Sequence, residues 1–262
     1  LGNQMFQYAN ALAVVTICKQ PLFLDLIDLS MHFSNRSFKL NHFQLDDDVR
    51  WGNFSKTSSE MLITEQNFHF VPIQLDPDVT GFYIRGFWQS ERYFSIIESL
   101  IRSHFQFKQV LTDAYLKALD KISTCNAVSL HIRRGDYCSD EAVQKVHPVC
   151  PISYYDRALK QLSLIMSDLQ LFVFSDDVEW CKQHFSSEYP VHFIQDMVPA
   201  NDVMELQLIT HCKHHIIANS TFSWWGAWLC TNPNKQVIAP KNWFKDEGIN
   251  TKDLTPDSWI LI

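Results

Sequence analysis

The alternation of apolar and polar positions is most regular in residues 127–133. The apolar residues there are Val128, Leu130 and Ile132, and they alternate with the polar residues Ser129, His131 and Arg133. A period of two is typical of a β-strand and places His131 and Arg133 together on one face. Gly135 then ends the strand. An imidazole and a guanidinium at a strand end predict an anion site, and a phosphate is the first candidate ligand.

The second half of the chain repeats this strand signal at regular intervals. Strands are predicted over five segments, 127–133, 170–174, 191–194, 214–218 and 236–239. A helix is predicted over 151–167, with Pro151 at its start, and Asp202 with Glu205 resembles a capping box that begins a later helix. Strands that alternate with helices predict a parallel sheet with right-handed crossovers. We therefore expect residues 116–262 to form a Rossmann-like nucleotide-binding domain, although it lacks the GxGxxG loop.

Residues 1–115 have a looser pattern and are expected to form a domain of their own. A helix is predicted over 3–19, a buried strand over 21–26, and a strand, a turn and a helix over 81–107. Asn3 lies at the start of the first helix, where free backbone N–H groups favour an anion. A contact to a phosphate or sugar oxygen and a plain helix cap are equally supported for Asn3. Because the chain enters this helix at once, the first strand of the domain is expected before Leu1, outside the sequence.

The composition of the chain argues against several classes of function. The 262 residues suffice for two modest domains, and a formal net charge of −7 argues against broad nucleic-acid binding. The seven cysteines are scattered without CxxC spacing, which favours reduced thiols of a cytosolic type. Cys212, His214 and His215 fit a buried strand start better than a zinc site, since no second ligand pair has the spacing. No apolar run reaches the ~18–20 residues of a membrane span, and no secretory signal is recognisable.

Two further strand ends carry polar groups. Asp176 and Asp177 follow the predicted strand 170–174 and can accept hydrogen bonds from a guanine edge, hold a ribose hydroxyl, or cap the next helix. Residues 219–223 connect a strand to a helix and are rich in hydroxyls, which is typical of a phosphate cradle. Three such strand ends in one sheet favour a nucleoside diphosphate pocket.

These segments resemble the α-1,2-fucosyltransferases of glycosyltransferase family 11, which transfer L-fucose from GDP-β-L-fucose to galactose. The resemblance runs nearly end to end. It rests on LGNQMFQYA (1–9), GFWQSERYF (86–94), HIRRGDY (131–137), FSDD (174–177), CKHHIIANSTFSWWGAWL (212–229) and VIAPKNWF (237–244). Among members of this family, the chain resembles the bacterial ones.

The resemblance implies an α/β fold of the GT-B type, with two Rossmann-like halves that face a central cleft. Residues 1–115 would form the acceptor side and residues 116–262 the side that binds GDP-fucose. The implied donor-binding residues are Gly2, Asn3, His131, Arg133, Asp176, Asp177, Asn219, Ser220, Thr221, Phe222 and Ser223. Arg133 would hold the diphosphate, Asp176 or Asp177 would bind guanine, and Asn3 would reach the donor from the first half. Arg133 and Asn3 are thus the implied catalytic residues.

The chemistry implied is metal-independent inversion without a cofactor, because cationic side chains and a helix start can neutralise the departing diphosphate. Base candidates for the galactose 2-hydroxyl are Asp25, Glu91 and Asp136, and the departing phosphate is the alternative proton acceptor. Trp88 could stack on galactose, although core packing is the better-supported interpretation. Arg134 is expected to pair with a carboxylate such as Asp136.

The sequence thus predicts a cytoplasmic galactoside α-1,2-fucosyltransferase whose partners are GDP-β-L-fucose and a galactose-terminated oligosaccharide, with no nucleic acid. Peripheral membrane association with lipid-linked glycans, the natural acceptor and the oligomeric state stay open. The alternatives are a GDP-fucose-dependent transferase of another linkage or acceptor, and a non-catalytic protein that binds sugar nucleotides or glycans.

Overall fold

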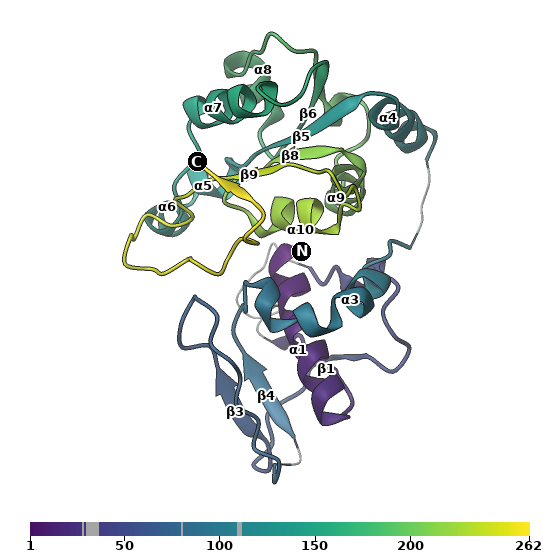
Figure 1. The fold of residues 1–262 in the computed structure, drawn as a ribbon. Coiled ribbons are helices and arrows are strands. Elements are labelled where there is room, and N and C mark those ends of the chain that lie inside the picture. The colour runs from purple at the N-terminus through teal and green to yellow at the C-terminus, as the bar shows by residue number, and fades with distance from the viewer. Residues whose placement is uncertain (28, 30–36, 80, 109–111) are drawn as a thin grey trace. The chain divides into compact units, whose positions relative to one another are not determined.

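The computed structural model describes residues 1–27, 29, 37–79, 81–108 and 112–262 (Figure 1). The chain divides into two compact units. Unit 1 comprises Leu1–Lys108 and Asn250–Pro256, and unit 2 comprises Gln109–Ile249 and Asp257–Ile262. The short segment Asn250–Pro256, close to the end of the chain, therefore packs with the first half.

The described part of unit 2 contains a six-stranded sheet in the order β10-β9-β8-β5-β6-β7. Its strands are β5 (Asn126–Ile132), β6 (Leu169–Ser175), β7 (Val191–Phe193), β8 (His214–Ile216), β9 (Val237–Ala239) and β10 (Ile260–Leu261). Every pairing in this sheet is parallel. The predicted parallel sheet and the α/β fold class are confirmed. The two-residue strand β10 was not predicted, because so short a segment carries no periodic signal.

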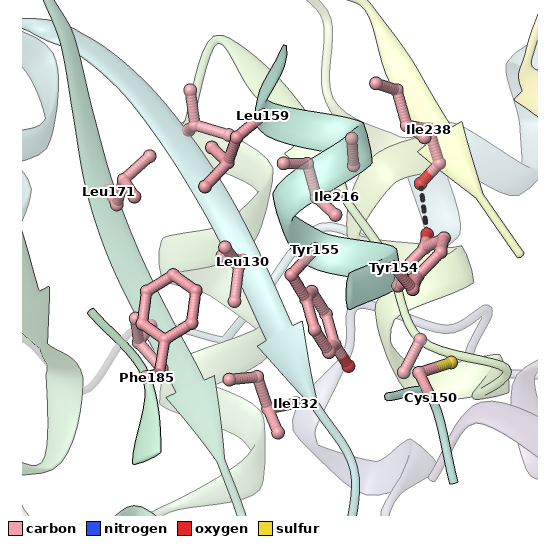
Figure 2. Packing of buried hydrophobic residues seen from close by; sticks show 14 of the residues in the cluster. Leu130, Ile132, Cys150, Tyr154, Tyr155, Leu159, Leu171, Phe185, Ile216 and Ile238 are labelled. Carbon is pink, nitrogen blue, oxygen red and sulfur yellow. Dashed lines mark hydrogen bonds between the residues drawn. The ribbon is translucent and has the colours of Figure 1, made fainter. Parts of the chain in front are cut away.

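Helices cover both faces of this sheet. On one face, α7 (Ile152–Ser163) and α8 (Val178–His184) pack on a core that includes Leu130 and Ile132 (Figure 2). On the other face, α4 (Asp113–Ser123) and α9 (Asp202–His211) pack on Phe172 and Phe174. Each fully buried apolar side chain of this kind contributes roughly 1.5–3 kcal/mol to folding. Burial on both faces explains why β6, with the sequence LQLFVFS, is a nearly continuous apolar run.

One helix end and one helix cap differ from the prediction. Helix α7 begins after Pro151 as predicted but ends at Ser163, before residue 167. Helix α9 is capped by Asn201, whose Oδ1 accepts hydrogen bonds from the backbone N–H groups of Val203 and Met204 at 3.0 and 3.1 Å. The helix begins at Asp202 as predicted, but its N-cap residue is Asn201, because the preceding amide side chain supplies the better-placed acceptor.

Three helices near the strand ends complete unit 2. Helices α5 (Gly135–Ser139) and α6 (Glu141–Val146) follow β5, and α10 (Thr221–Leu229) follows β8. Helix α10 packs closely on α9: a Cβ atom added at Gly226 would meet Cγ2 of Ile209, with Cβ of that side chain at 2.9 Å. Glycine at this position allows the two helices to approach.

Unit 1 is built around α1 (Gly2–Cys18), which confirms the predicted first helix. Its buried apolar residues are Met5, Phe6, Tyr8, Ala9, Leu12, Ala13 and Val14. The helix ends at Lys19, whose φ of 54° is the left-handed conformation common at helix C-termini. The Tyr8 hydroxyl lies 2.6 Å from Nδ1 of His104 in α3 (Glu98–His104), which links the first helix to the last of the unit.

The strands of unit 1 form two small parallel sheets. Strand β1 (Phe23–Asp25) pairs with β2 (Arg50–Gly52), and β3 (Met61–Thr64) pairs with β4 (Phe82–Arg85). The prediction of a buried strand over 21–26 was wrong in burial, since Phe23 is 52% exposed. A run of apolar residues indicates a strand but does not reveal how much of it the neighbouring elements cover.

The segment after β4 is less regular than predicted. The described part of unit 1 contains three short 3-10 helices, η1 (Leu40–His42), η2 (Glu91–Tyr93) and η3 (Ser95–Ile97). The last two replace the first turns of the single helix that was predicted before residue 107. Ser90 caps η2 by accepting a hydrogen bond from the Arg92 N–H group at 3.3 Å. None of the helices in the described part of the chain is both long and apolar enough to cross a membrane.

Candidate functional site

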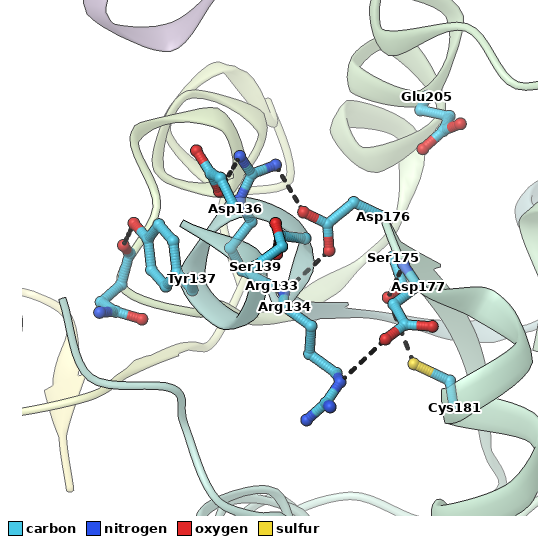
Figure 3. A network of polar contacts seen from close by, with 12 residues as sticks. Arg133, Arg134, Asp136, Tyr137, Ser139, Ser175, Asp176, Asp177, Cys181 and Glu205 are labelled. Atoms are coloured by element: carbon cyan, nitrogen blue, oxygen red, sulfur yellow. Dashed lines mark hydrogen bonds and ion pairs between the residues drawn. The ribbon is translucent and has the colours of Figure 1, made fainter. Parts of the chain in front are cut away.

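Arg133 lies just beyond the end of β5, and two carboxylates hold its guanidinium. Nη2 donates to Oδ1 of Asp136 at 2.7 Å, and Nη1 donates to Oδ2 of Asp176 at 2.8 Å (Figure 3). Asp136 lies in the first turn of α5, and Asp176 directly follows β6, the neighbour of β5 in the sheet. A guanidinium has five N–H donors, so these two bonds fix its plane and leave donors for an anion.

Gly135 allows the turn after β5 to come close to Asp176. A Cβ atom at Gly135 would lie 2.5 Å from Oδ2 of Asp176, the oxygen that binds Arg133. Any side chain there would displace the carboxylate or the backbone. The glycine of the HIRRGDY segment therefore serves the geometry of Arg133 as well as the end of the strand.

Arg134 points to a different set of partners. Its backbone N–H group donates to Oδ1 of Asp176 at 2.8 Å, and its Nε donates to Oδ2 of Asp177 at 3.1 Å. Its guanidinium carbon lies 3.6 Å from the centre of the Trp180 ring. The expectation that Arg134 pairs with a carboxylate is confirmed, but the partner is Asp177 and not the suggested Asp136, which pairs with Arg133. Strand alternation correctly separated the two arginines but could not identify carboxylates more than 40 residues away.

Asp177 also caps the next helix. Its Oδ1 accepts a hydrogen bond from the Trp180 N–H group at 3.3 Å at the start of α8. Every carboxylate oxygen of Asp176 and Asp177 therefore has a partner within the protein. Both residues position arginines in the structure, and Asp177 has in addition the capping role that the sequence left open.

His131 lies beside Arg133 as a buried, neutral imidazole. It is 5% exposed, and its ring centre lies 5.5 Å from that of Phe222. Burial, together with the Arg133 charge, lowers the pKa of His131 to about 3. Its Nδ1 is buried and has no hydrogen-bond partner among the described residues. At neutral pH, the positive charge of this strand end therefore comes from the arginines alone.

The loop before α10 brings backbone N–H groups to the neighbouring strand end. Ser220 is the N-cap residue, and its side chain makes no capping hydrogen bond. The Ser223 hydroxyl donates to the Ser220 carbonyl at 3.2 Å. Ser220 and Ser223 are buried, whereas Thr221 and Phe222 are half-buried. Because β8 and β5 are adjacent in the sheet, the start of α10 and Arg133 lie at the same edge, where a helix dipole and a guanidinium both favour an anion.

The Asn219 side chain ties this loop to two other segments of the chain. Its Nδ2 donates to the carbonyl oxygens of Pro148 at 2.9 Å and Trp243 at 3.1 Å. The backbone carbonyl of Asn219 accepts a hydrogen bond from the Tyr137 hydroxyl at 2.9 Å. The side chain of Asn219 thus holds three loops together, and a direct donor contact is not needed to explain it.

The sequence did not identify two polar residues at the same edge as candidates for a binding site. Glu205, near the start of α9, is 9% exposed, and its Oε2 accepts a hydrogen bond from Nε2 of Gln195 at 3.3 Å. Burial raises the pKa of Glu205 to about 7. The sequence explained Glu205 as part of a capping box and had no signal for Gln195. The sequence contained one sign that Glu205 is buried: it stands among apolar residues in the first turn of the predicted helix.

The remaining predicted residues belong to unit 1. Gly2 and Asn3 lie in the first turn of α1, where Oδ1 of Asn3 accepts a hydrogen bond from Nε2 of Gln89 at 3.2 Å. The N-cap residue is Leu1, without a side-chain cap. The helix-cap interpretation of Asn3 was therefore wrong, and its amide is part of a polar corner with Gln89.

Asn3, Asp25 and Trp88 line one pocket of about 710 Å³ in unit 1. Trp88 is 4% exposed and packs edge-on against Tyr93 at 5.3 Å, as the core-packing interpretation expected. Its backbone has a φ of 58° and is held by Glu65, which accepts its N–H at 3.0 Å.

The carboxylates of unit 1 differ in how strongly they are engaged. Asp25 accepts hydrogen bonds at Oδ1 from the N–H groups of Ile27 and Phe54, and at Oδ2 from the Tyr83 hydroxyl at 2.5 Å. It anchors a turn and is poorly placed to act as a base. Glu91 is half-buried in η2 and lies outside the residues that line the pocket.

The histidine and cysteine side chains of the described residues form neither a metal site nor a disulfide. Within the described ranges, no group of three or more His, Cys, Asp or Glu side chains is arranged to hold a metal ion. His214 and His215 are buried at the start of β8, where His215 Nδ1 lies 2.8 Å from the Ser129 hydroxyl. All seven cysteines lie in the described part of the chain, and none forms a disulfide.

Comparison with known proteins identifies the family. The model of glycosyl transferase family 11 matches residues 1–262. The chain is 35% identical to an α-1,2-colitosyltransferase of Escherichia coli, over 100% of this chain and 96% of that protein, and 32% identical to the Escherichia coli O-antigen biosynthesis glycosyltransferase WbnK, over 99% and 97%. Mouse galactoside 2-alpha-L-fucosyltransferase Sec1 is 25% identical over 87% of this chain and 62% of its own length.

A structural likeness supports the fold. The structure of an Arabidopsis thaliana FUT1 mutant in complex with GDP matches 98% of this chain and 72% of its own, with a TM-score of 0.50 and 10% identity. This likeness confirms the GT-B-like fold class. The whole-chain match to the family model and the two bacterial relatives above 30% identity show more: the chain belongs to glycosyltransferase family 11.

Proposed function

We propose that this glycosyltransferase transfers L-fucose from GDP-β-L-fucose to the 2-hydroxyl of a terminal galactose, with inversion to an α-1,2-fucoside. The observation that carries the proposal is the guanidinium of Arg133, held between Asp136 and Asp176 at the sheet edge that also contains the start of α10. A galactoside fucosyltransferase among the relatives and a fold shared with a GDP complex support this choice of donor.

Arg133 and the start of α10 would stabilise the leaving group. Cleavage of the glycosyl–phosphate bond develops negative charge on the diphosphate, and preorganised donors at that position lower the barrier. We propose that Arg133 donates to the diphosphate oxygens, while the backbone N–H groups at residues 221–223 bind the same group. Loss of one such donor typically costs ~3–4 kcal/mol in the transition state. Neither a metal ion nor a cofactor is part of this proposal.

Unit 1 would supply the acceptor side. Its pocket contains the amide of Asn3, which can bind a sugar hydroxyl. Two of the three base candidates are already engaged, Asp25 with Tyr83 and Asp136 with Arg133. The third, Glu91, lies outside the residues that line the pocket, so we propose that the departing phosphate takes the proton of the acceptor hydroxyl.

A second candidate function is transfer of colitose, because the α-1,2-colitosyltransferase is more similar to the chain than the fucosyltransferase Sec1 is. Colitose is L-fucose without its 3-hydroxyl, so the same diphosphate and guanine contacts would serve both donors. A site that hydrogen-bonds the 3-hydroxyl rejects the deoxy sugar strongly, whereas a site without such a contact accepts both.

Calorimetry tests the donor. GDP and GDP-fucose should bind and UDP should bind at least tenfold more weakly; equal affinity for GDP and UDP, or no binding of GDP, would contradict the proposal. Kinetic competition between GDP-fucose and GDP-colitose then decides the sugar. Activity that survives EDTA would support the metal-free mechanism, and activity that EDTA abolishes and Mg²⁺ or Mn²⁺ restores would refute it.

Arg133→Lys tests the leaving-group contact, with the exposed Arg157→Lys on α7 as the matched control. A lysine is a point charge that cannot bind two oxygens in the fork geometry of a guanidinium. We expect kcat to fall about 100- to 1000-fold in Arg133→Lys and to stay unchanged in the control. Near-normal turnover of Arg133→Lys would remove the central residue of the proposal.

A further inference from the structure

Phe87 is an exposed aromatic residue in the wall of the unit 1 pocket. It is 44% exposed, whereas the neighbouring Trp88 is 4% exposed and packs on Tyr93. Both residues follow β4 directly, in the segment 86–88. Exposure alone would mean little, because single apolar side chains are common on protein surfaces. What distinguishes Phe87 is the way in which its backbone is held.

Three hydrogen bonds from side chains hold the backbone of the segment 86–88. Oε2 of Glu65 accepts the N–H group of Phe87 at 2.8 Å, and Oε1 of the same carboxylate accepts the N–H group of Trp88 at 3.0 Å. Nε2 of Gln7, in α1, donates to the Gly86 carbonyl at 2.9 Å. Glu65 directly follows β3, so two separate elements of unit 1 fix the position of the Phe87 backbone.

This arrangement is costly, which indicates that the segment serves a purpose other than stability. Trp88 has a φ of 58°, a conformation that a bulky residue adopts only where its surroundings enforce it. Glu65 is half-buried, and burial raises the pKa of its carboxyl while the two N–H donors act in the opposite direction. Gly86 leaves room for this carboxylate, because an added Cβ atom would lie 2.9 Å from Oε2 of Glu65. Strained backbone and half-buried charges gather at ligand sites.

The other groups that line the pocket fit a neutral sugar. Amide side chains line it at Asn3, Gln4, Gln7, Gln20 and Asn53. The charged side chains in the lining are Asp25, Glu60 and Arg85, a set that does not favour a diphosphate. A pyranose carries hydroxyl groups around its rim and C–H groups on its faces. Amides can bind the rim, and an exposed ring such as that of Phe87 can cover a face.

Galactose suits an aromatic ring particularly well. Its axial 4-hydroxyl lies on one face of the pyranose and leaves the C–H groups of C3, C4 and C5 together on the other. We propose that this apolar face of the acceptor galactose stacks on the ring of Phe87, and that Glu65 is the positioning residue that holds Phe87 in place. This inference rests on the proposed function, since it assigns the sugar contact of the acceptor side.

Kinetics of fucosyl transfer to lactose, with calorimetry of GDP binding, test the role of Phe87. Phe87→Ala should raise KM for lactose about tenfold, because the sugar loses its aromatic contact, and should leave KM for GDP-fucose and the affinity for GDP unchanged. Phe87→Tyr keeps the ring and should keep KM for lactose. The control Trp51→Ala removes an aromatic residue of unit 1 that is 42% exposed and lies outside the pocket lining.

Glu65→Gln tests the positioning role. An amide has one acceptor oxygen, so its NH₂ group would face one of the two backbone N–H donors and push the segment away. KM for lactose should rise at least about threefold, again without an effect on GDP-fucose. Because Glu65 acts through Phe87, the double variant should have the same KM as Phe87→Ala. Glu98→Gln, at an exposed position of α3, is the matched control.

The outcomes separate this inference from the proposed function. Transfer to lactose with an unchanged KM in Phe87→Ala would overturn the sugar contact and leave the fucosyltransferase proposal intact. Effects of Phe87→Ala and Glu65→Gln that multiply in the double variant would refute the positioning role. If Glu65→Gln does not fold, Glu65→Asp, whose shorter side chain withdraws from the N–H groups, takes its place in the comparison.

Lactose binding followed by ligand-observed NMR carries the test if GDP-fucose is not used as a donor. Binding by the unaltered protein that is lost in Phe87→Ala would support the sugar contact while the choice of donor fails. No lactose binding by the unaltered protein would overturn both.

Discussion

Nη1 of Arg133 lies 2.8 Å from Oδ2 of Asp176, although 43 residues separate them in the sequence. The contact joins the ends of two adjacent parallel strands, β5 and β6, whose register pairs Ile132 with Ser175. The same carboxylate accepts the backbone N–H group of Arg134. Asp176 therefore fixes both the guanidinium and the backbone of the turn that carries it.

Replacement of this carboxylate tests its positioning role. Asp176→Asn should lower kcat/KM for the donor about 10- to 100-fold, because a misplaced guanidinium loses transition-state contacts. Asp156→Asn, at an exposed position of α7, is the control for loss of one charge. Unchanged kcat/KM in Asp176→Asn would contradict this positioning role.

Gly135→Ala should damage the site through sterics alone. The added Cβ would lie 2.5 Å from Oδ2 of Asp176, so the carboxylate must move away from Arg133. We expect turnover to fall by at least tenfold with a loss of about 1–3 kcal/mol in the free energy of unfolding. Gly52→Ala, whose Cβ meets no atom closer than 3.6 Å, is the matched control. Kinetics and urea unfolding measure both, and full activity of Gly135→Ala would contradict the packing described.

Gly226→Ala tests the contact between α9 and α10. The methyl group would overlap Ile209, and overpacking of this kind costs about 1–3 kcal/mol or more. Ile209→Ala removes Cγ2, the nearest atom, so the double variant should be less destabilised than the sum of the single variants. Strict additivity in urea unfolding would indicate that the two residues do not meet.

The stability of the protein should depend on pH through Glu205. Its pKa is about 7 in the folded protein, raised by burial from 4.5, with the charges of Asp202 and Asp176 acting in the same direction. Between these pH values the folded chain holds a proton that the unfolded chain has lost. The free energy of unfolding therefore falls by up to about 3 kcal/mol as the pH rises from 4.5 to 7, and this contribution is constant above pH 7.

Glu205→Gln removes that titration, and other groups cancel in the comparison. Urea unfolding at pH 5 and pH 8 should show a steeper fall of stability in the unaltered protein than in the variant. Parallel pH profiles would mean that the Glu205 carboxyl titrates normally and is more solvated than the structure indicates.

Much of unit 2 could be predicted from the sequence because its signals are local. Alternation of Val128, Leu130 and Ile132 identified β5, and the repeated strand–helix order implied a parallel sheet, which the structure confirms. His131 and Arg133 share a strand end for the same reason. Where burial depends on neighbouring elements, as for the exposed Phe23 in β1, local apolarity was misleading.

Partner choice at the site could not be predicted, because it is determined by contacts across the sheet. The pairing of Arg134 with Asp177 spans 43 residues, and nothing near Arg134 distinguishes Asp177 from Asp136. The hydrogen bond between Gln195 and Glu205 depends on how η4 (Ile194–Asp196) and α9 meet after folding. Roles for individual carboxylates therefore required the structure, whereas the presence of an anion site did not.

The most direct test of the central claim is product analysis by NMR after incubation with GDP-fucose and lactose. The account predicts consumption of GDP-fucose, release of GDP and a new fucose residue in α configuration on the 2-hydroxyl of galactose, with Arg157→Lys unchanged and Arg133→Lys nearly inactive. Binding of GDP without any transfer, or a fucoside with β configuration or at another hydroxyl, would contradict it.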